Sequence, residues 1–204
     1  MTTPYNASTG SAATDELVVL LDDGGRAVGT ADKRSVHHGS TPLHLAFSCY
    51  VFDATGRLLV TRRALEKPTF PGAWTNSACG HPRPGERLRD AVSRRVHEEL
   101  GLALHDLRIV LPLFRYRATG PNGAQENEIC PVFTARTAEQ PRPDDAEVAA
   151  TRWEPWSEFS AGVLDGSREV SPWCREQVPQ LVRLGADPLL WAGVSPSTLP
   201  LAAL

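Results

Sequence analysis

The sequence predicts an α/β (α+β) fold in which a mixed β-sheet sandwich is flanked by helices. Several short apolar runs are bounded by turn residues, as is typical of strands. Residues 88–100 instead place apolar side chains at helical spacing, and residues 155–185 suggest further helices. Strands mixed with helices along one chain favour sheets that are covered by helices.

The predicted strands are apolar segments that end at Gly, Pro, Asn or Asp. In chain order they cover residues 16–21, 28–30, 43–52, 57–63, 107–116, 126–134 and 151–153. The turn at 53–56 joins two of them as a hairpin, and the turn at 121–123 joins a second pair. Residues 33–38 form a polar segment, 70–76 a loop and 144–148 a short polar link.

The helix predicted at 88–100 has one continuous apolar stripe. Its members are Leu88, Ala91, Val92, Val96 and Leu100. Gly101 follows the last turn, where glycine commonly ends a helix in the left-handed conformation.

The chain of 204 residues is long enough for one domain with its own core. We assign residues 15–185 to that domain. Residues 1–14 are small and polar and are expected to form a flexible N-terminal tail. Residues 186–204 are rich in Pro and Ala and form a C-terminal tail without assigned structure.

Composition excludes several classes of protein. A net charge of −3 provides no basic field for nucleic acid or a membrane surface, and no apolar run is long enough to span a bilayer. The N-terminus lacks the charged start and apolar stretch of a secretory signal. Four cysteines, none spaced C-x-x-C, make no disulfide framework. We therefore expect a cytoplasmic, soluble, monomeric enzyme that binds neither nucleic acid nor membrane.

The loop before the helix brings a thiol, an imidazole and carboxylates close together. Cys79 and His81 open this loop, Glu86 lies within it, and Glu98 and Glu99 lie in the last turn of the helix. Carboxylates on one helix face bind hard divalent cations, which in turn hold a diphosphate.

This unit resembles the Nudix box, G-x5-E-x7-R-E-U-x-E-E-x-G-U, in which U is a bulky apolar residue. The positions in register are Gly80, Glu86, Arg94, Val96, Glu98, Glu99, Gly101 and Leu102. One position departs from the box, because Arg95 stands where a glutamate is expected. A cation there should weaken the metal clustering needed for hydrolysis and could instead grip a phosphate oxygen.

Further stretches resemble type I isopentenyl-diphosphate isomerase, in order over residues 17–173. They are T-P-L-H-L-A-F-S at 41–48, T-R-R-A-L at 61–65, W-T-N-S-A-C-G-H-P at 74–82, F-R-Y-R-A at 114–118 and E-N-E-I-C-P-V-F at 126–133. The resemblance implies a Nudix-like fold. It also implies an enzyme that interconverts isopentenyl and dimethylallyl diphosphate, so that its partner is a small isoprenoid diphosphate.

By this resemblance three residues are catalytic. Cys79 would exchange a proton with one face of the alkene, and Glu128 would be its acid partner on the other face. Tyr116 would donate a hydrogen bond near that carboxylate, although an aromatic residue of the core is the plain alternative. The other three cysteines keep the usual structural interpretation of a cysteine.

The resemblance implies two metal sites. The ligands of the first are His37, His44, His81, Glu126 and Glu128. Such a set suits Mn²⁺, Zn²⁺ or Mg²⁺, and carboxylates at i and i+2 point to one face of a strand, as a shared cation requires. Glu99 would bind the Mg²⁺ that arrives with the diphosphate.

Four cations are implied to hold the diphosphate, although exposed surface charge is the commonest role of Lys and Arg. They are Lys33, Arg63, Lys67 and Arg95. Trp173 would cover the cavity and stabilise a carbocation-like state through its π face, with simple packing as the alternative.

Two other functions stay open on the sequence. A Nudix pyrophosphohydrolase acting on a diphosphate would release phosphate and would not need Cys79. Arg95 and the pairing of Cys79 with Glu128 argue against it. A non-catalytic metal-bound scaffold would keep its function after Cys79→Ala.

Overall fold

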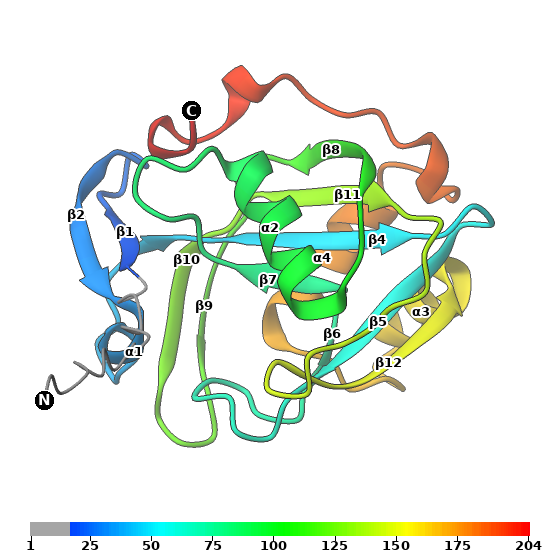
Figure 1. Cartoon of the computed structure of the whole chain (residues 1–204), viewed down its shortest axis with the longest axis horizontal. Helices are drawn as coiled ribbons and strands as arrows, with labels where there is room; N and C mark the ends of the chain where they lie inside the picture. Colours follow the sequence, from blue (N-terminus) through cyan, green and yellow to red (C-terminus); the bar gives the residue numbers. More distant parts are fainter. Residues whose placement is uncertain (1–16) are drawn as a thin grey trace, which may run out of the picture.

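The computed structural model describes residues 17–204, so the tail expected at 1–14 lies outside the described residues. Two β-sheets form the centre of the molecule (Figure 1). One has the order β2-β1-β3-β10-β9, formed by Ala27–Asp32, Leu17–Leu21, His44–Leu45, Gln125–Ile129 and Arg115–Thr119. The other has the order β12-β5-β4-β11-β8, formed by Val148–Pro155, Arg57–Arg63, Phe47–Phe52, Val132–Arg136 and His105–Leu111. Two short strands complete it, with β6 (Trp74–Thr75) on β5 and β7 (Ala78–Gly80) on β4.

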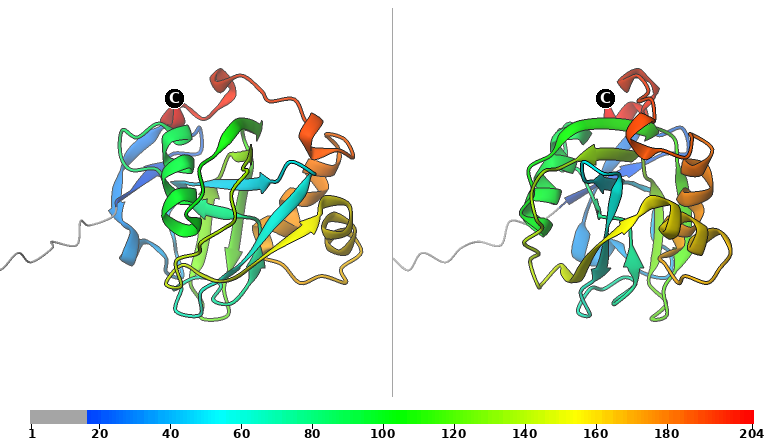
Figure 2. Two further views of the ribbon diagram at one scale, coloured as in Figure 1. Left: turned by 45° about the vertical axis from the view of Figure 1, so that its right-hand side comes forward. Right: turned by 90° about the vertical axis from the view of Figure 1, so that its right-hand side faces the viewer.

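Helices cover both faces of the larger sheet (Figure 2). The helix α2 (Leu88–Leu100) packs on one face, and α3 (Trp156–Leu164) and α4 (Pro172–Val182) pack on the other. The helix α1 (Lys33–Val36) is a single turn. All five residues of the predicted stripe on α2 are buried, and a fully buried Leu or Val contributes about 1.5–3 kcal/mol of hydrophobic stabilisation. The predicted sandwich with flanking helices is confirmed.

Three segments predicted as single strands are each divided between the two sheets. Residues 43–52 form β3 and β4, residues 126–134 contribute to β10 and β11, and residues 107–116 contribute to β8 and β9. At the second division lies Pro131, which has no N–H to donate to a ladder. The prediction of unbroken strands was wrong because one apolar run can cross two buried sheets without changing its sequence pattern.

These divisions bring residues from both sheets into one region. The parallel pairing of β3 with β10 continues as the parallel pairing of β4 with β11. Glu128 on β10 lies opposite His44 on β3. Cys79 on β7 lies opposite Ser48 on β4, just beyond the bend. Because these segments pass from one sheet to the other, the predicted thiol and the predicted acid lie at the junction of the two sheets.

Both predicted hairpin turns are confirmed. The turn at 53–56 joins β4 to β5 and has Gly56 at a φ of +80°, although the two strands pair only at Phe52 and Leu58. The turn at 121–123 joins β9 to β10, which pair over their whole length.

The C-terminal residues 186–204 run back across the domain as three short 3-10 helices, Pro188–Leu190, Pro196–Thr198 and Leu201–Ala203 (Figure 1). Trp191 is 1% exposed, and its ring lies 5.1 Å from that of Trp156 and 5.9 Å from that of Phe52. The division of the chain into tail, domain and tail stays a prediction. Within residues 17–204, no helix is both long and apolar enough to cross a membrane.

Candidate active site

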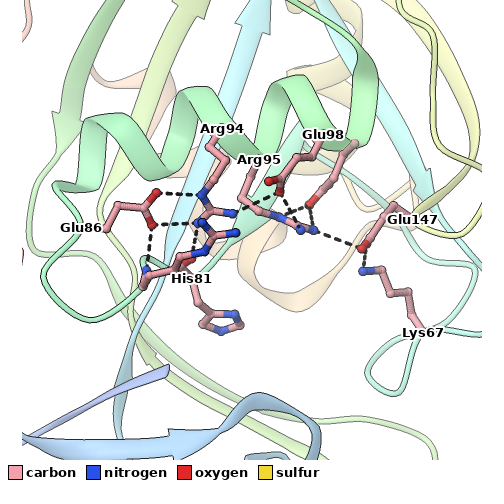
Figure 3. A network of polar contacts seen from close by, with 9 residues as sticks. Lys67, His81, Glu86, Arg94, Arg95, Glu98 and Glu147 are labelled. Carbon is pink, nitrogen blue, oxygen red and sulfur yellow. Dashed lines mark hydrogen bonds and ion pairs between the residues drawn. The ribbon is translucent and has the colours of Figure 1, made fainter. Parts of the chain in front are cut away.

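An ion pair fastens the loop before α2 to the helix. Arg94 donates two hydrogen bonds to Glu86, from Nε to Oε1 at 2.7 Å and from Nη2 to Oε2 at 2.8 Å (Figure 3). The same guanidinium reaches the main-chain carbonyl of His81 at 3.4 Å. Glu86 also accepts the N–H of Arg83 at 2.8 Å. Because the loop is held at these points, the position of His81 is tied to the helix.

We expect Glu86→Gln to lower the free energy of unfolding by about 2 kcal/mol near pH 7, because a charged, partly buried hydrogen-bond pair is lost. The hydrogen bond from Arg94 is the main cause that lowers the pKa of Glu86 from 4.5. This stability is present above the ordinary pKa and is lost as the pH falls through the lowered one. The difference between the proteins in urea denaturation should therefore shrink below pH 4.5. A difference that is constant with pH would contradict this assignment.

Two glycines of the Nudix box have a backbone explanation. A Cβ at Gly80 would lie 3.0 Å from Cγ of Arg95 and 3.1 Å from Cζ of Phe47, so glycine allows α2 to approach β7. Gly101 has a φ of +65° and ends the helix by donating its N–H to the carbonyl of His97.

Three imidazoles and a carboxylate converge at the end of the smaller sheet. Ligand atoms of His37, His44, His81 and Glu128 all lie within 4.8 Å of one another. Oε1 of Glu128 is 3.4 Å from Nε2 of His44 and 3.2 Å from Nε2 of His81. Glu126 joins the group through His37, with 3.0 Å between Oε2 and Nε2. These are the five predicted ligands of the first metal site.

The ring nitrogens of this group are oriented for a metal. Nδ1 of His44 lies 2.9 Å from the carbonyl of Pro42, and Nδ1 of His37 lies 3.3 Å from the carbonyl of Lys33. Each Nδ1–H can donate to its carbonyl, which leaves the lone pair of Nε2 directed at the group. Both Nε2 atoms and Oε2 of Glu126 are buried without a hydrogen bond. Each of these nitrogen–oxygen contacts needs a proton or a metal ion to be favourable, and three imidazoles with two carboxylates are a donor set that fits a divalent metal.

The thiol of Cys79 lies beside this group. Its Sγ is 3.3 Å from Oδ1 of Asn76, to which it donates, and 3.4 Å from Oγ of Ser48. Burial raises the pKa of Cys79 to about 12, so the sulfur carries its proton at neutral pH. Burial also opposes ionisation of Glu128, but its contacts with the imidazoles of His44 and His81 outweigh burial and hold its pKa well below the ordinary value. A protonated sulfur and an ionised carboxyl therefore coexist.

One cavity of about 100 Å³ collects most of the predicted site. Among the predicted residues, its lining contains Lys33, His37, Arg63, Lys67, Cys79, His81, Arg95, Tyr116, Glu126, Glu128 and Trp173. His44, the remaining member of the imidazole group, is fully buried and is absent from the lining. Glu99 lines a small adjoining cavity that also touches Cys79.

The aromatic residues form one wall of the cavity. The rings of Tyr116 and Trp173 lie 5.7 Å apart, and the guanidinium of Arg63 lies 5.4 Å from the centroid of the Trp173 ring. Burial raises the pKa of Tyr116 well above its ordinary value, so its hydroxyl keeps its proton. Tyr116 also lies opposite Glu128 across the pairing of β9 with β10. Both aromatic residues are thus core residues that face the cavity.

Two of the basic residues at the cavity, Lys67 and Arg95, lie among carboxylates (Figure 3). Arg95 lies 3.2 Å from Glu98 and pairs closely with Glu99. Glu99 is buried, whereas the side chain of Glu98 is 39% exposed. A further carboxylate, Glu147, contacts both Arg95 and Lys67.

Two residues at the site were missed by sequence reasoning. Oδ1 of Asn76 accepts the thiol of Cys79 and, at 3.0 Å, the indole N–H of Trp173, so one amide positions both. Asn76 lies within the stretch W-T-N-S-A-C-G-H-P, but an asparagine in a loop is ordinarily a turn residue. Glu147 lies in the polar link at 144–148, where nothing in the local pattern indicates a contact with the helix.

The NUDIX domain family matches residues 42–174. A Saccharopolyspora erythraea protein named isopentenyl-diphosphate Delta-isomerase is 58% identical over 93% of this chain and 97% of its own length. The chain belongs to the isopentenyl-diphosphate Delta-isomerase family of NUDIX proteins. Family members of the same name from Mycolicibacterium vanbaalenii and Rhizobium rhizogenes are 60% and 50% identical, over 84% and 100% of this chain and 94% and 95% of their own lengths.

Solved structures of low sequence identity have a similar fold. A protein of Deinococcus radiodurans is similar with a TM-score of 0.62 and 20% identity, over 81% of this chain and 98% of its own. The MutT protein of Methanosarcina mazei is similar with a TM-score of 0.54 and 20% identity, over 70% and 94%. At this identity the comparison supports the NUDIX fold alone.

Proposed function

We propose that this protein is an isopentenyl-diphosphate Delta-isomerase that interconverts isopentenyl and dimethylallyl diphosphate. The observation that carries the proposal is that one cavity is lined by Cys79, Glu128, the imidazole group and basic residues. Membership of the isomerase family supports the same reaction. An unactivated alkene needs an acid and a base that are held in a site from which water is excluded.

Cys79 and Glu128 together account for both proton transfers of the reaction. One gives a proton to the terminal CH₂ carbon of the alkene, and the other removes a proton from the carbon beside the one that bears the diphosphate. Cys79 and Glu128 come from different sheets, so they can address different faces of a five-carbon chain. The faces of Tyr116 and Trp173 would stabilise the tertiary carbocation-like state between the two transfers.

The basic residues would hold the diphosphate away from the reacting carbons. Lys33, Arg63, Lys67 and Arg95 all line the cavity. Arg95 stands where a glutamate of the Nudix box would stand, so the helix presents a phosphate-binding cation there. Glu99 would bind the Mg²⁺ that accompanies the diphosphate.

A divalent metal in the His/Glu group would supply positive charge that favours the ionised form of Glu128 and fixes its orientation. We propose Mn²⁺, Zn²⁺ or Mg²⁺ as that metal, on the grounds of three nitrogen and two carboxylate ligands. We further propose a cytoplasmic enzyme that acts as a monomer.

We expect excess chelator to abolish isomerisation and added Mn²⁺ or Mg²⁺ to restore it, because the buried lone pairs of His37 and His44 then lose their cation. Calorimetric titration of the chelated protein with Mn²⁺ should show binding that His37→Ala weakens at least tenfold, because even the loss of a hydrogen-bond partner behind a ligand costs about 10–100-fold. Full activity in excess chelator would contradict the metal site.

The direct test is incubation with isopentenyl diphosphate in deuterated water. Mass spectrometry and NMR should show dimethylallyl diphosphate with deuterium taken up, because one of the two transferred protons comes from an exchangeable group. The same samples report on hydrolysis. Phosphate release without a dimethylallyl product would identify a pyrophosphohydrolase instead and overturn the proposal.

A further inference from the structure

The carboxylate of Glu147, outside the Nudix box, bridges two of the cavity's cations. Its Oε1 is 3.2 Å from Nη2 of Arg95, and its Oε2 is paired with Nζ of Lys67 (Figure 3). Side-chain exposure is only 8% for Arg95, 19% for Lys67 and 23% for Glu147. One carboxylate thus forms ion pairs with a cation on the helix and a cation on a loop, each through a different oxygen.

The main chain holds Glu147 in this position. The N–H of Glu147 donates to the carbonyl of Asp144 at 2.9 Å, which closes the turn before β12. The carbonyl of Glu147 accepts the N–H of Ala64 at 3.0 Å, and the carbonyl of Ala64 accepts the N–H of Lys67 at 3.3 Å. Glu147 and Lys67 are therefore connected through backbone hydrogen bonds as well as through their side chains.

The charge balance of the cavity explains why a carboxylate is needed there. Lys67 and Arg95 share the cavity with Lys33 and Arg63. Burial lowers the pKa of Lys67 to about 8; the charge of Glu99 opposes this shift, and the charges of the other three cations add to it. Like charges held together in a partly buried site oppose one another unless an anion lies between them. Glu99 and Glu147 supply that negative charge in the ligand-free protein, and of the two Glu147 is the one paired with both Lys67 and Arg95.

We propose that Glu147 is an internal counter-ion that competes with the substrate's diphosphate for Lys67 and Arg95. The inference rests on the proposed function, in which these two cations grip the diphosphate. A phosphate oxygen is attracted by the full charge of Lys67 and Arg95 only when the carboxylate of Glu147 no longer pairs with them. The carboxylate therefore limits the affinity for the substrate. Glu147 is a positioning residue: it keeps both cations in place until the anion replaces it.

The other carboxylates around Arg95 are placed differently. Glu99 is the expected Mg²⁺ ligand, so the Mg²⁺ that accompanies the diphosphate would neutralise its negative charge. Glu98 lies 3.2 Å from Arg95 but is 39% exposed and also accepts from Arg94 at 3.1 Å. Solvent screening makes such an exposed pair weak. Among the described residues, Glu147 is the carboxylate paired with both Lys67 and Arg95.

The test compares Glu147→Gln with wild type for binding of inorganic pyrophosphate, measured by calorimetry in the full-length protein without substrate. Glutamine keeps the size of the side chain and removes its charge. We expect pyrophosphate to bind about 3- to 10-fold more tightly to the variant, as removal of a nearby screened negative charge predicts. KM for isopentenyl diphosphate should fall by a similar factor. The control Glu98→Gln should change the pyrophosphate affinity less than twofold.

Thermal denaturation separates competition from a merely structural role. Glu147→Gln should melt at a lower temperature than wild type without pyrophosphate, and saturating pyrophosphate should raise its melting temperature by more than that of wild type. Glu147→Asp, which keeps the charge, should return the pyrophosphate affinity toward the wild-type value. Unchanged or weaker pyrophosphate binding by Glu147→Gln, or no binding by either protein, would overturn the inference. The deuterium experiment decides the proposed function independently.

Discussion

Replacement of Cys79 by serine should reduce kcat for isopentenyl diphosphate by about 10²–10⁴-fold or more in a protein that stays folded. The sulfur lies in the cavity with hydrogen-bond partners in Ser48 and Asn76, both of which a hydroxyl can still reach. What serine lacks is the acidity of a thiol, and therefore the ability to exchange a proton with carbon. The loss should thus appear in turnover, measured by radiolabelled or NMR assay, and not in the melting temperature.

A matched control is available in Cys49, a buried thiol on β4 that lies opposite Ala78. Cys49→Ala should cost about 1 kcal/mol of stability through lost packing. Its turnover should stay close to that of wild type, because Cys49 belongs to the hydrophobic core and lies outside the cavity. Normal turnover by Cys79→Ser would remove Cys79 from the chemistry.

Glu128→Gln should cause a second loss of activity of about 10²–10⁴-fold or more, since removal of one partner in proton transfer has an effect of this order. The carboxylate lies within 3.4 Å of two imidazoles and lines the cavity. A glutamine retains one oxygen for contact but can neither accept nor release a proton. Steady-state kinetics should therefore show the loss mainly in kcat.

The control for this carboxylate is Glu154, which is buried on β12 and paired with Arg152 and Arg168. It lies outside the cavity. Glu154→Gln should destabilise the fold because it weakens a buried charge pair, and should leave turnover near the wild-type level. Glu128→Gln with ordinary turnover would show that the metal-side carboxyl has no part in the reaction.

The reliability of sequence reasoning differed between elements for a physical reason. The helix at 88–100 and its end at Gly101 were predicted because its apolar stripe and this glycine are local features. The segments 43–52 and 126–134 have equally local patterns but were assigned as unbroken strands. The point at which each segment passes from one sheet to the other depends on the strand with which it pairs. That strand belongs to a distant segment, so the local sequence pattern does not indicate it.

The candidate site shows the same division. Motif matches identified Cys79, the imidazoles and Glu128 as candidate site residues. In the structure they lie around the junction of the two sheets. Asn76 lies within one of the motifs, but no role was predicted for it, because its contact with Trp173 spans 97 positions of the sequence. Glu147 had no motif at all, and its contact with Lys67 spans 80 positions.

The sequence by itself determined the class of fold, the loop-to-helix unit and the family, because propensities, turn residues and motif spacing act between near neighbours in the chain. Only the tertiary structure decided where strands pass between sheets, that Cys79 and Glu128 line one cavity, and that Glu147 pairs with two of its cations. These depend on burial and charge between distant segments, whose energies exist only once the chain has folded.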